Sequence, residues 1–191
     1  MRKSRQEAAE TRQRIVNAAS AEFRRNGIDR TGLADLMMAA GLTHGGFYKH
    51  FDSKEQVVEE SIAHGIEAMV EAWHRTLSKA PANRGLRTAI AEYLSIDHRD
   101  DIATSCPFSA LGSEMVRTGD PVREAATAGF LKMIDVIAGE LEDMTPAAAR
   151  KEALWIMSSM IGAVTMARVV NDPELSASIL REARKHLTRQ S

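Results

Sequence analysis

Hydrophobic positions recur at helical spacing along nearly the whole chain. In residues 8–26, apolar side chains return every three or four positions, as at Ile15, Ala19 and Phe23. Residues 54–80 continue with a longer stripe that includes Ile62, Ile66 and Trp73. No segment alternates apolar and polar residues as a half-buried strand does. The pattern therefore predicts an all-α chain.

Capping and stop residues divide this pattern into about nine predicted helices. Asp120-Pro121, Thr145-Pro146 and Asp172-Pro173 each place a capping residue before a proline, which is a strong helix start. Thr31, Thr43 and Ser53 are the predicted N-caps of earlier helices, and Gln56 completes a capping-box pattern with Ser53. A polar break is expected at 97–101. The predicted helices span residues 8–26, 31–40, 44–50, 53–80, 83–97, 105–115, 120–143, 145–171 and 172–188.

Composition limits the class of protein. Abundant Ala, Leu, Met, Glu and Arg favour helix. A single cysteine, Cys106, excludes an internal disulfide framework and points to a reducing compartment. We expect no signal peptide, because no basic-then-apolar leader opens the chain. The most apolar run, 154–170, is shorter than the roughly 20 residues of a membrane span and contains Arg168, so we expect a buried helix, a cytoplasmic location and no membrane partner.

Charge is distributed unevenly. Residues 1–54 hold 10 Lys and Arg against 6 Asp and Glu, a balance of +4. Residues 55–191 hold 15 against 20, a balance of −5. Such a division suits a polyanion-binding module of residues 1–54 attached to a second domain of residues 55–191. Charge alone does not exclude a chance fluctuation.

The segment 41–54 contains the densest set of local signals. Gly41 can adopt positive φ and end one helix, and Thr43 can cap the next. The following helix is too short to be stable alone in water, so neighbours must hold it. Phe47 and Phe51 stand four positions apart and can pack inward together. Two short packed helices joined by a glycine turn predict a helix-turn-helix that presents one helix to a DNA major groove.

Several side chains of this segment suit contact with a duplex. Gly45 and Gly46 allow close approach of the backbone, at a cost of about 1 kcal/mol each in helix propensity relative to Ala. The N-terminus of the predicted helix 44–50 favours phosphate binding. A phenol side chain and positively charged side chains come later in the same segment. The residues that could make such contacts are Thr43, Tyr48, Lys49, His50 and Lys54.

Each of these residues also has a simpler structural explanation. Thr43 and Ser53 could act only as caps, Tyr48 could be a half-buried core residue, and Gly45-Gly46 could be a loop. The combination at this spacing, after an amphipathic helix, favours DNA binding.

Residues 10–58 resemble the N-terminal domain of the tetracycline-repressor (TetR) family of bacterial regulators. The resemblance runs through ETRQRIVNAA, FRRNG, Leu36 to Gly41, and GGFYKHFDSKEQV. It implies an all-helical, two-domain homodimer with three DNA-binding helices and a C-terminal domain that binds a small-molecule effector. By the same resemblance, contacts to the DNA backbone come from Thr31, Thr43, Tyr48, His50 and Lys54, whereas His44, Gly45 and Gly46 face the base edges.

The sequence departs from the family at positions 44–46, where Lys-Gly followed by Ser, Thr or Ala is commoner. Gly46 removes a side chain that could contact a base. Base readout is therefore expected to rely on His44 and Lys49.

The predicted helix 145–171 is apolar nearly all round. A helix with two apolar faces has two partners, and we expect one to be its own core and the other the same helix of a second subunit. The final helix, with Leu175, Ile179 and Leu180, would join this interface. The alternative is a helix fully buried in a monomer.

An effector pocket is predicted between the helices of the second half. Met-rich, aromatic walls are adaptable and suit apolar ligands, although side chains at such spacing are more often plain core. Cys106 could contact the ligand or sense oxidants, or it could be a small buried hydrophobe. The candidate residues are Met69, Trp73, Tyr93, Cys106, Phe108, Met115, Phe130, Met133 and Met160.

Motifs of enzymes and metal sites do not occur in the sequence. The six histidines form no pair at i, i+4, and His98 among Asp97, Asp100 and Asp101 is interpreted as a solvated loop. A nucleophile elbow, a Walker loop and a Rossmann fingerprint are absent, so we expect no catalytic residue, metal or cofactor. The sequence predicts a non-enzymatic repressor that a small apolar or aromatic effector releases from a palindromic operator. The alternatives are an all-α ligand-binding protein or enzyme whose N-terminal helices only pack, and a protein-interaction module.

Overall fold

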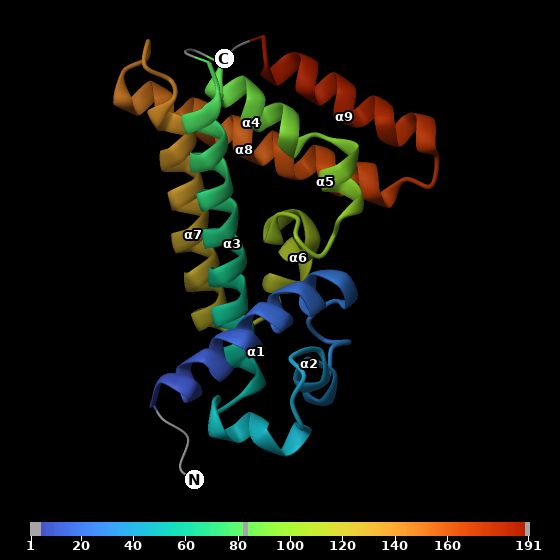
Figure 1. Cartoon of the computed structure of the whole chain (residues 1–191). Helices are drawn as coiled ribbons and strands as arrows, with labels where there is room; N and C mark the ends of the chain where they lie inside the picture. The colour runs from blue at the N-terminus through green and yellow to red at the C-terminus, as the bar shows by residue number, and fades with distance from the viewer. Residues whose placement is uncertain (1–4, 82–83, 190–191) are drawn as a thin grey trace.

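The computed structural model describes residues 5–81 and 84–189, and within these ranges every regular element is a helix. The prediction of an all-α chain is confirmed (Figure 1). The elements are α1 (Arg5–Asn26), α2 (Leu33–Ala39), the 3-10 helix η1 (His44–Lys49), α3 (Lys54–Lys79), α4 (Gly85–Tyr93), α5 (Ile96–Asp100), α6 (Pro107–Met115), α7 (Asp120–Gly139), α8 (Pro146–Val169) and α9 (Pro173–Leu187).

Two predicted elements differ from the observed ones. The third helix is a 3-10 helix, η1, and not an α-helix. The predicted helix 83–97 ends at Tyr93, and the expected polar break at 97–101 is wrong because α5 occupies most of it. Ser95 starts α5, since its hydroxyl accepts a hydrogen bond from the backbone N–H of His98 at 3.0 Å.

Several predicted helix ends are confirmed by their local hydrogen bonds. Ser53 accepts from the N–H of Gln56 at 3.1 Å, and Thr145 and Asp172 cap α8 and α9. Gly27 and Gly41 have φ of 88° and 68°, a region that favours glycine. These helix starts and stops depend on contacts within a few residues.

Four of the predicted caps are wrong in detail. Asp120 is the first residue of α7, whose N-cap is Gly119. Gly32, not Thr31, is the N-cap of α2, and the Thr31 hydroxyl donates to the carbonyl of Gly27 at 2.7 Å. Thr43 occupies the N-cap position of η1, but its side chain makes no capping hydrogen bond. The Gln56 carboxamide accepts from the N–H of Asp52 at 2.9 Å rather than from that of Ser53.

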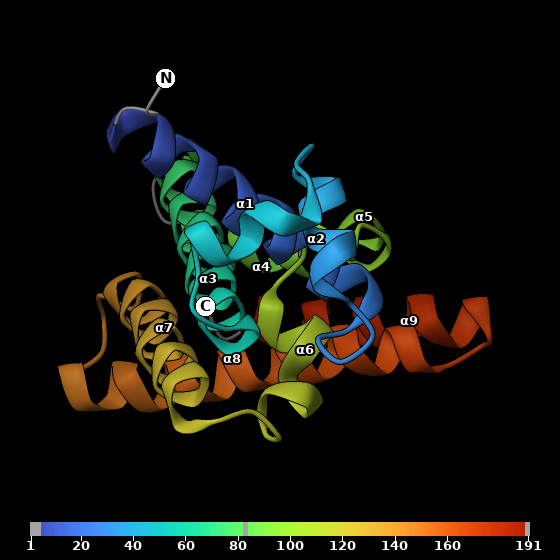
Figure 2. The same ribbon diagram turned by 90° about the horizontal axis from the view of Figure 1, so that it is seen from below.

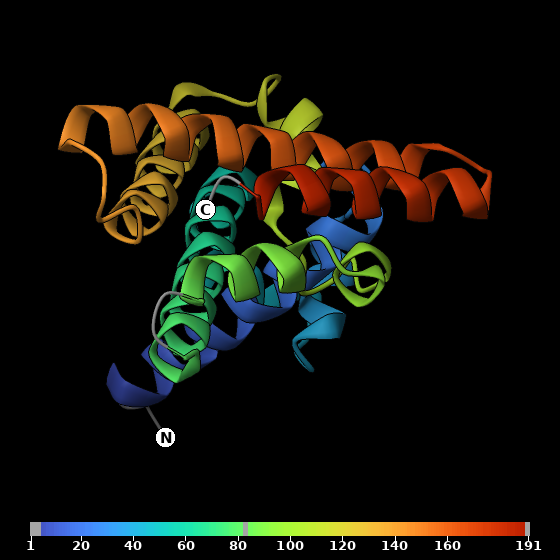
Figure 3. The same cartoon turned by 90° about the horizontal axis from the view of Figure 1, so that it is seen from above.

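The long helix α3 connects the two halves of the molecule. It begins beside η1 and α1 and rises next to α7, so that α3 and α7 stand side by side (Figure 1). From below, α1, α2 and η1 lie together at one end of this pair (Figure 2). From above, α8 and α9 form two adjacent rods across the other end, with α4 close by (Figure 3).

A single hydrophobic cluster runs through both halves. It includes Phe23 and Phe47 at the α1–η1 end and Met160 and Leu180 at the α8–α9 end. Residues of α3, such as Ile62, belong to the same cluster. The helices around η1 therefore share a continuous core with the rest of the molecule, and the division at residues 54 and 55 remains a prediction. In the described part of the chain, no helix has both the length and the apolar character needed to cross a membrane.

Candidate nucleic-acid interface and effector pocket

The 3-10 helix η1 is held by two phenylalanines. Phe47 and Phe51 have 0% and 2% of their surface exposed, and their rings stack with centroids 5.5 Å apart. The prediction that they pack inward together is confirmed. Burying each of these side chains stabilises the fold by about 1.5–3 kcal/mol. This packing stabilises η1, which is too short to be stable alone in water.

A residue that the sequence interpretation missed, Arg12, also holds η1. Its guanidinium forms an ion pair with Glu60, donates to the carbonyl of His50 at 3.2 Å, and lies 4.4 Å from the centre of the Phe51 ring. Arg12 therefore ties α1 to the end of η1 and to α3. Glu60 lies 48 residues away from it, and no local pattern indicates such a pair.

One edge of η1 faces solvent, and we call it the η1 edge: Thr43, His44, Gly45, Tyr48 and Lys49. All five residues are exposed, and Tyr48 has 67% of its surface accessible. A Cβ added at Gly45 would meet no atom within 4 Å. The η1 edge is therefore open and partly cationic, and these properties suit contact with a polyanion.

Other predicted DNA-contact residues are engaged within the protein. Thr31 is 1% exposed. The Lys54 ammonium donates to the carbonyl of Ile28 at 2.6 Å and so holds the loop between α1 and α2. His50 and Gly46 are half-buried, and a Cβ at Gly46 would lie 3.4 Å from Cε of Met37. DNA contact by these residues remains a prediction.

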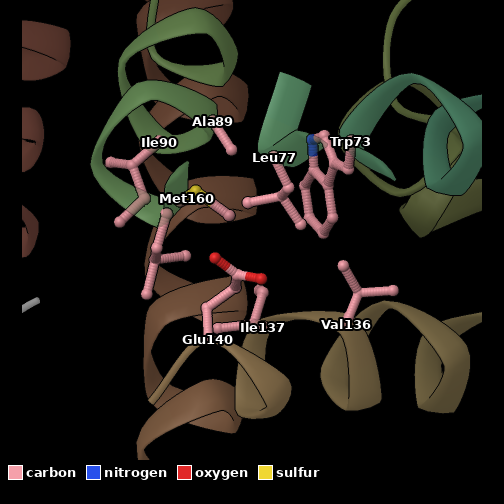
Figure 4. A pocket seen from close by; sticks show the side chains of 9 residues that line it. Trp73, Leu77, Ala89, Ile90, Val136, Ile137, Glu140 and Met160 are labelled. Carbon is pink, nitrogen blue, oxygen red and sulfur yellow. The ribbon is translucent and has the colours of Figure 1, made fainter. Parts of the chain in front are cut away.

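A small apolar pocket lies between α3, α4, α7 and α8 (Figure 4). Its free volume is about 10 Å³, which is room for about one water molecule. Trp73 and Met160, both predicted effector residues, line it. The full lining is Trp73, Leu77, Leu86, Ala89, Ile90, Val136, Ile137, Glu140 and Met160.

The remaining predicted effector residues lie elsewhere. Phe108 and Phe130 form an edge-to-face pair with ring centroids 5.4 Å apart, and Met69 is half-buried against the core. Met115 and Met133 are buried in the core. The structure therefore does not bring the predicted effector residues together around one cavity, and their role in binding stays a prediction.

Tyr93, His98 and Cys106 form a polar cluster beside the pocket, in which Tyr93 and Cys106 are buried and His98 is half-buried. The Tyr93 ring lies 6.1 Å from that of Trp73, and its buried hydroxyl lies next to the Cys106 thiol. His98 Nδ1 lies 2.6 Å from the Tyr93 carbonyl, and His98 Nε2 accepts from the N–H of Cys106 at 3.1 Å. The interpretation of His98 as part of a solvated loop is wrong.

Burial governs the protonation of this cluster. It lowers the pKa of His98, although the hydrogen bond to the Tyr93 carbonyl opposes the shift. It raises the pKa of the Cys106 thiol, which is 0% exposed. Since the thiolate is the reactive form, these surroundings favour a structural Cys106 over a sensor of oxidants.

Models of known protein families match most of the chain. Residues 15–61 match the model of bacterial regulatory proteins of the tetR family. Residues 81–186, more than half of the chain, match the C-terminal domain of LmrA/YxaF-like transcriptional regulators. The chain belongs to the tetR family. The resemblance of residues 10–58 is thereby confirmed, and the second match extends it through the C-terminal helices.

Curated tetR-family relatives align mainly with the N-terminal part. The HTH-type transcriptional regulator TtgR of Pseudomonas putida is 37% identical over 76 residues, which are 40% of this chain and 32% of TtgR. AcrR of Shigella flexneri is 42% identical over 59 residues, which are 31% of this chain and 27% of AcrR. The chain thus spans about a third of the length of the curated relatives that it matches.

Solved structures share the fold over nearly the full chain. A TetR transcriptional regulator from Chloroflexus aurantiacus is 27% identical, with a TM-score of 0.79, and the alignment covers 96% of this chain and 95% of that one. Reduced NemR of Escherichia coli is 20% identical with a TM-score of 0.78, covering 94% and 96%. At that identity the second likeness shows the fold alone.

In this tetR-family protein, three polar contacts join α1, the loop after it and the first turn of α3 to α6 and the loops on either side of α6. Glu114 of α6 accepts from the N–H of Ile28 at 2.6 Å, and Arg24 of α1 donates to the carbonyl of Ala103 at 2.6 Å. Glu55 of α3 accepts from the N–H of Gly119 at 3.1 Å. A movement of α6 or of the loop before it would therefore act directly on α1 and on the loop after it.

Proposed function

We propose that the protein is a ligand-responsive, cytoplasmic repressor that binds a palindromic operator as a homodimer and leaves it when a small apolar or aromatic effector binds. The observation that carries the proposal is the position of α3. Its first turn follows the η1 edge, and its last turns supply Trp73 and Leu77 to the apolar pocket. One helix thus begins a few residues after a candidate DNA surface and lines a candidate ligand site.

The η1 edge supports contact with DNA through its chemistry. Thr43 makes no capping hydrogen bond, so its hydroxyl can donate to a phosphate. Tyr48 and Lys49 add a phenol and an ammonium on the same exposed edge. In the proposed complex His44 and the backbone at Gly45 approach base edges, and the open space around Gly45 supports this close approach.

An exposed apolar stripe on α8 supports the homodimer. Leu154, Trp155, Met166 and Val169 are 40–69% exposed, and Leu175 at the start of α9 is 48% exposed. The small residues Ser158 and Gly162, also exposed, connect Trp155 to Met166 at three-to-four spacing on the same face. Two-fold pairing through this stripe would bury it. Two copies of η1 would then address half-sites about 34–36 Å apart on one face of the duplex.

Release from DNA requires that the effector bind two conformations unequally. A ligand larger than one water must separate the helices around the pocket. We propose that the displacement passes to η1 through α3 and through the contacts of Arg24 and Glu114.

The DNA site is tested by fluorescence anisotropy with a labelled duplex from the region upstream of the gene. We expect Tyr48→Ala with Lys49→Ala to weaken binding at least about tenfold, because two phosphate contacts are lost, and to reduce the slope of log affinity against log salt by about one. Lys79→Ala, an exposed lysine at the far end of α3, is the matched control. Unchanged affinity in the folded double variant would refute the assignment of the η1 edge.

A further inference from the structure

One carboxylate lies in the otherwise apolar pocket between α3, α4, α7 and α8. Glu140 follows the last residue of α7, and its side chain points in among Leu77, Ile137 and Met160 (Figure 4). The other eight lining residues have apolar side chains apart from the indole N–H of Trp73. Glu140 therefore places a negative charge, on an exposed residue, at the edge of an otherwise apolar lining.

Within the described residues, the Glu140 carboxylate has no cationic partner and no hydrogen bond. It lies against the first residue of α4, because a Cβ added at Gly85 would sit 2.8 Å from Oε2 of Glu140 and 3.0 Å from Cδ2 of Leu77. Glycine at this position leaves room for the carboxylate at the pocket mouth. Glu140 is exposed, so the carboxylate is accessible to a ligand.

The residues around Glu140 suit the apolar part of a cationic ligand. Tryptophan attracts a cation through its ring face more strongly than tyrosine or phenylalanine does. Trp73 lines the pocket and is 5% exposed. Met160 provides a polarizable and adaptable surface on the α8 side. A neutral apolar ligand would gain nothing from Glu140, and an anionic one would be repelled by it.

We propose that the effector is a hydrophobic cation: a molecule with an apolar or aromatic body and one permanent positive charge. The charge would pair with Glu140 at the mouth, while the body would enter between Trp73 and Met160 and displace α4 from α7. This inference rests on the proposed function, because it names the chemical class of the effector at the same pocket.

The test compares two ions of the same shape and opposite charge, tetraphenylphosphonium and tetraphenylborate, by isothermal titration calorimetry with the full chain free of DNA. Benzyltrimethylammonium serves as a smaller cation. We expect the wild type to bind at least one of the two cations about tenfold or more tightly than tetraphenylborate. Glu140→Gln, which keeps the shape, should weaken binding of that cation about three- to tenfold.

Glu142→Gln is the matched control, since it removes the same charge from an exposed position two residues away. Glu140→Asp should keep the preference for the cation. Equal affinity for the two charges in the wild type, or wild-type affinity in Glu140→Gln, overturns the inference. Glu140→Gln that lowers only the melting temperature also overturns it and would assign Glu140 to stabilising the start of α4.

Operator release, measured separately by anisotropy, distinguishes this inference from the proposed function. Cation binding that depends on Glu140 but leaves operator affinity unchanged would support the inference and refute regulation by this pocket. Operator release by neutral aromatic compounds, without preference for cations, would overturn the inference and leave the proposed function standing.

Discussion

At the residue scale, Arg12 shows how one side chain organises a short element. It combines an ion pair with Glu60, a hydrogen bond to the backbone of His50, and contact with the Phe51 ring. Its three partners belong to α3 and to the segment after η1. Such a residue stabilises the geometry of the candidate DNA surface without belonging to it.

Arg12→Ala is therefore expected to lower the free energy of unfolding by about 1–2 kcal/mol, because it leaves Glu60 unpaired and removes the cation over Phe51. Urea denaturation followed by circular dichroism measures the change. Arg14→Ala, which alters an exposed arginine on the same helix, should have little effect. Equal stability of the two variants would mean that Arg12 does not hold η1.

Two glycines provide a second comparison at this scale. Gly27→Ala should destabilise by more than about 1 kcal/mol, since φ is +88° and the new Cβ would lie 2.9 Å from Oε1 of Glu114. Gly45→Ala should leave the melting temperature unchanged or raise it, because the space around Gly45 is open. Thermal denaturation of both variants checks the contrast, and similar losses at both positions would contradict it.

At the scale of elements, the junction of α4, α5, α6 and α8 depends on polar groups rather than on apolar packing alone. Arg168 of α8 donates to the carbonyls of His98 and Arg99 at 2.9 and 2.8 Å. His98 receives the N–H of Cys106 and contacts the Tyr93 carbonyl. The imidazole must be neutral at Nε2 to accept that N–H, so this junction is sensitive to pH.

The lowered pKa of His98 predicts the direction of this sensitivity. Burial is the main cause, with Arg168 acting in the same direction and the Tyr93 carbonyl and Asp101 opposing it. As the pH falls through about 6.5, His98 of the unfolded chain binds a proton that His98 of the folded protein does not yet bind. The contribution of His98 to the free energy of unfolding is therefore complete above that pH and is lost as the pH falls below it.

Urea denaturation at pH 7.5, 6.5 and 5.5 measures this contribution. We expect the stability of His98→Gln to depend less on pH between 7.5 and 5.5 than that of the wild type. His74→Gln, at an exposed position on α3, should retain the wild-type dependence. A His98→Gln profile parallel to that of the wild type would contradict the assignment.

At the scale of the whole molecule, the shared core and the exposed α8 stripe are the main features. The core is continuous from Phe47 to Leu180, whereas Trp155 and Met166 remain 45% and 49% exposed on α8. An apolar stripe of this kind on an otherwise packed helix is typical of a surface that another subunit covers.

Trp155→Glu should raise the dissociation constant of the proposed dimer at least about tenfold, because it replaces the largest apolar side chain of the stripe with a charge. Analytical ultracentrifugation over a concentration series measures this. Leu131→Glu, the same kind of change at a 40% exposed position on α7, should leave assembly unchanged. A wild-type monomer at micromolar concentration would refute the dimer.

The sequence by itself determined most of the helices, most of their ends and the family. Ser53, Thr145 and Asp172 cap through contacts two or three residues along the chain, and Gly27 and Gly41 act through their own backbone angles. Such signals are local, so the pattern of residues contains them. The amphipathic stripes also predicted Phe47 and Phe51 as buried, because helical spacing assigns residues to a face.

Only the tertiary structure decided which polar groups meet. Lys54 binds the carbonyl of Ile28, 26 residues away, and Glu114 binds the N–H of the same residue from 86 residues away. It also divided the predicted effector residues among several sites and placed Glu140, which the apolar pattern passed over, in the pocket. The physical reason is that side-chain partners across helices depend on how whole helices cross, and helical spacing within one segment contains no information about that geometry.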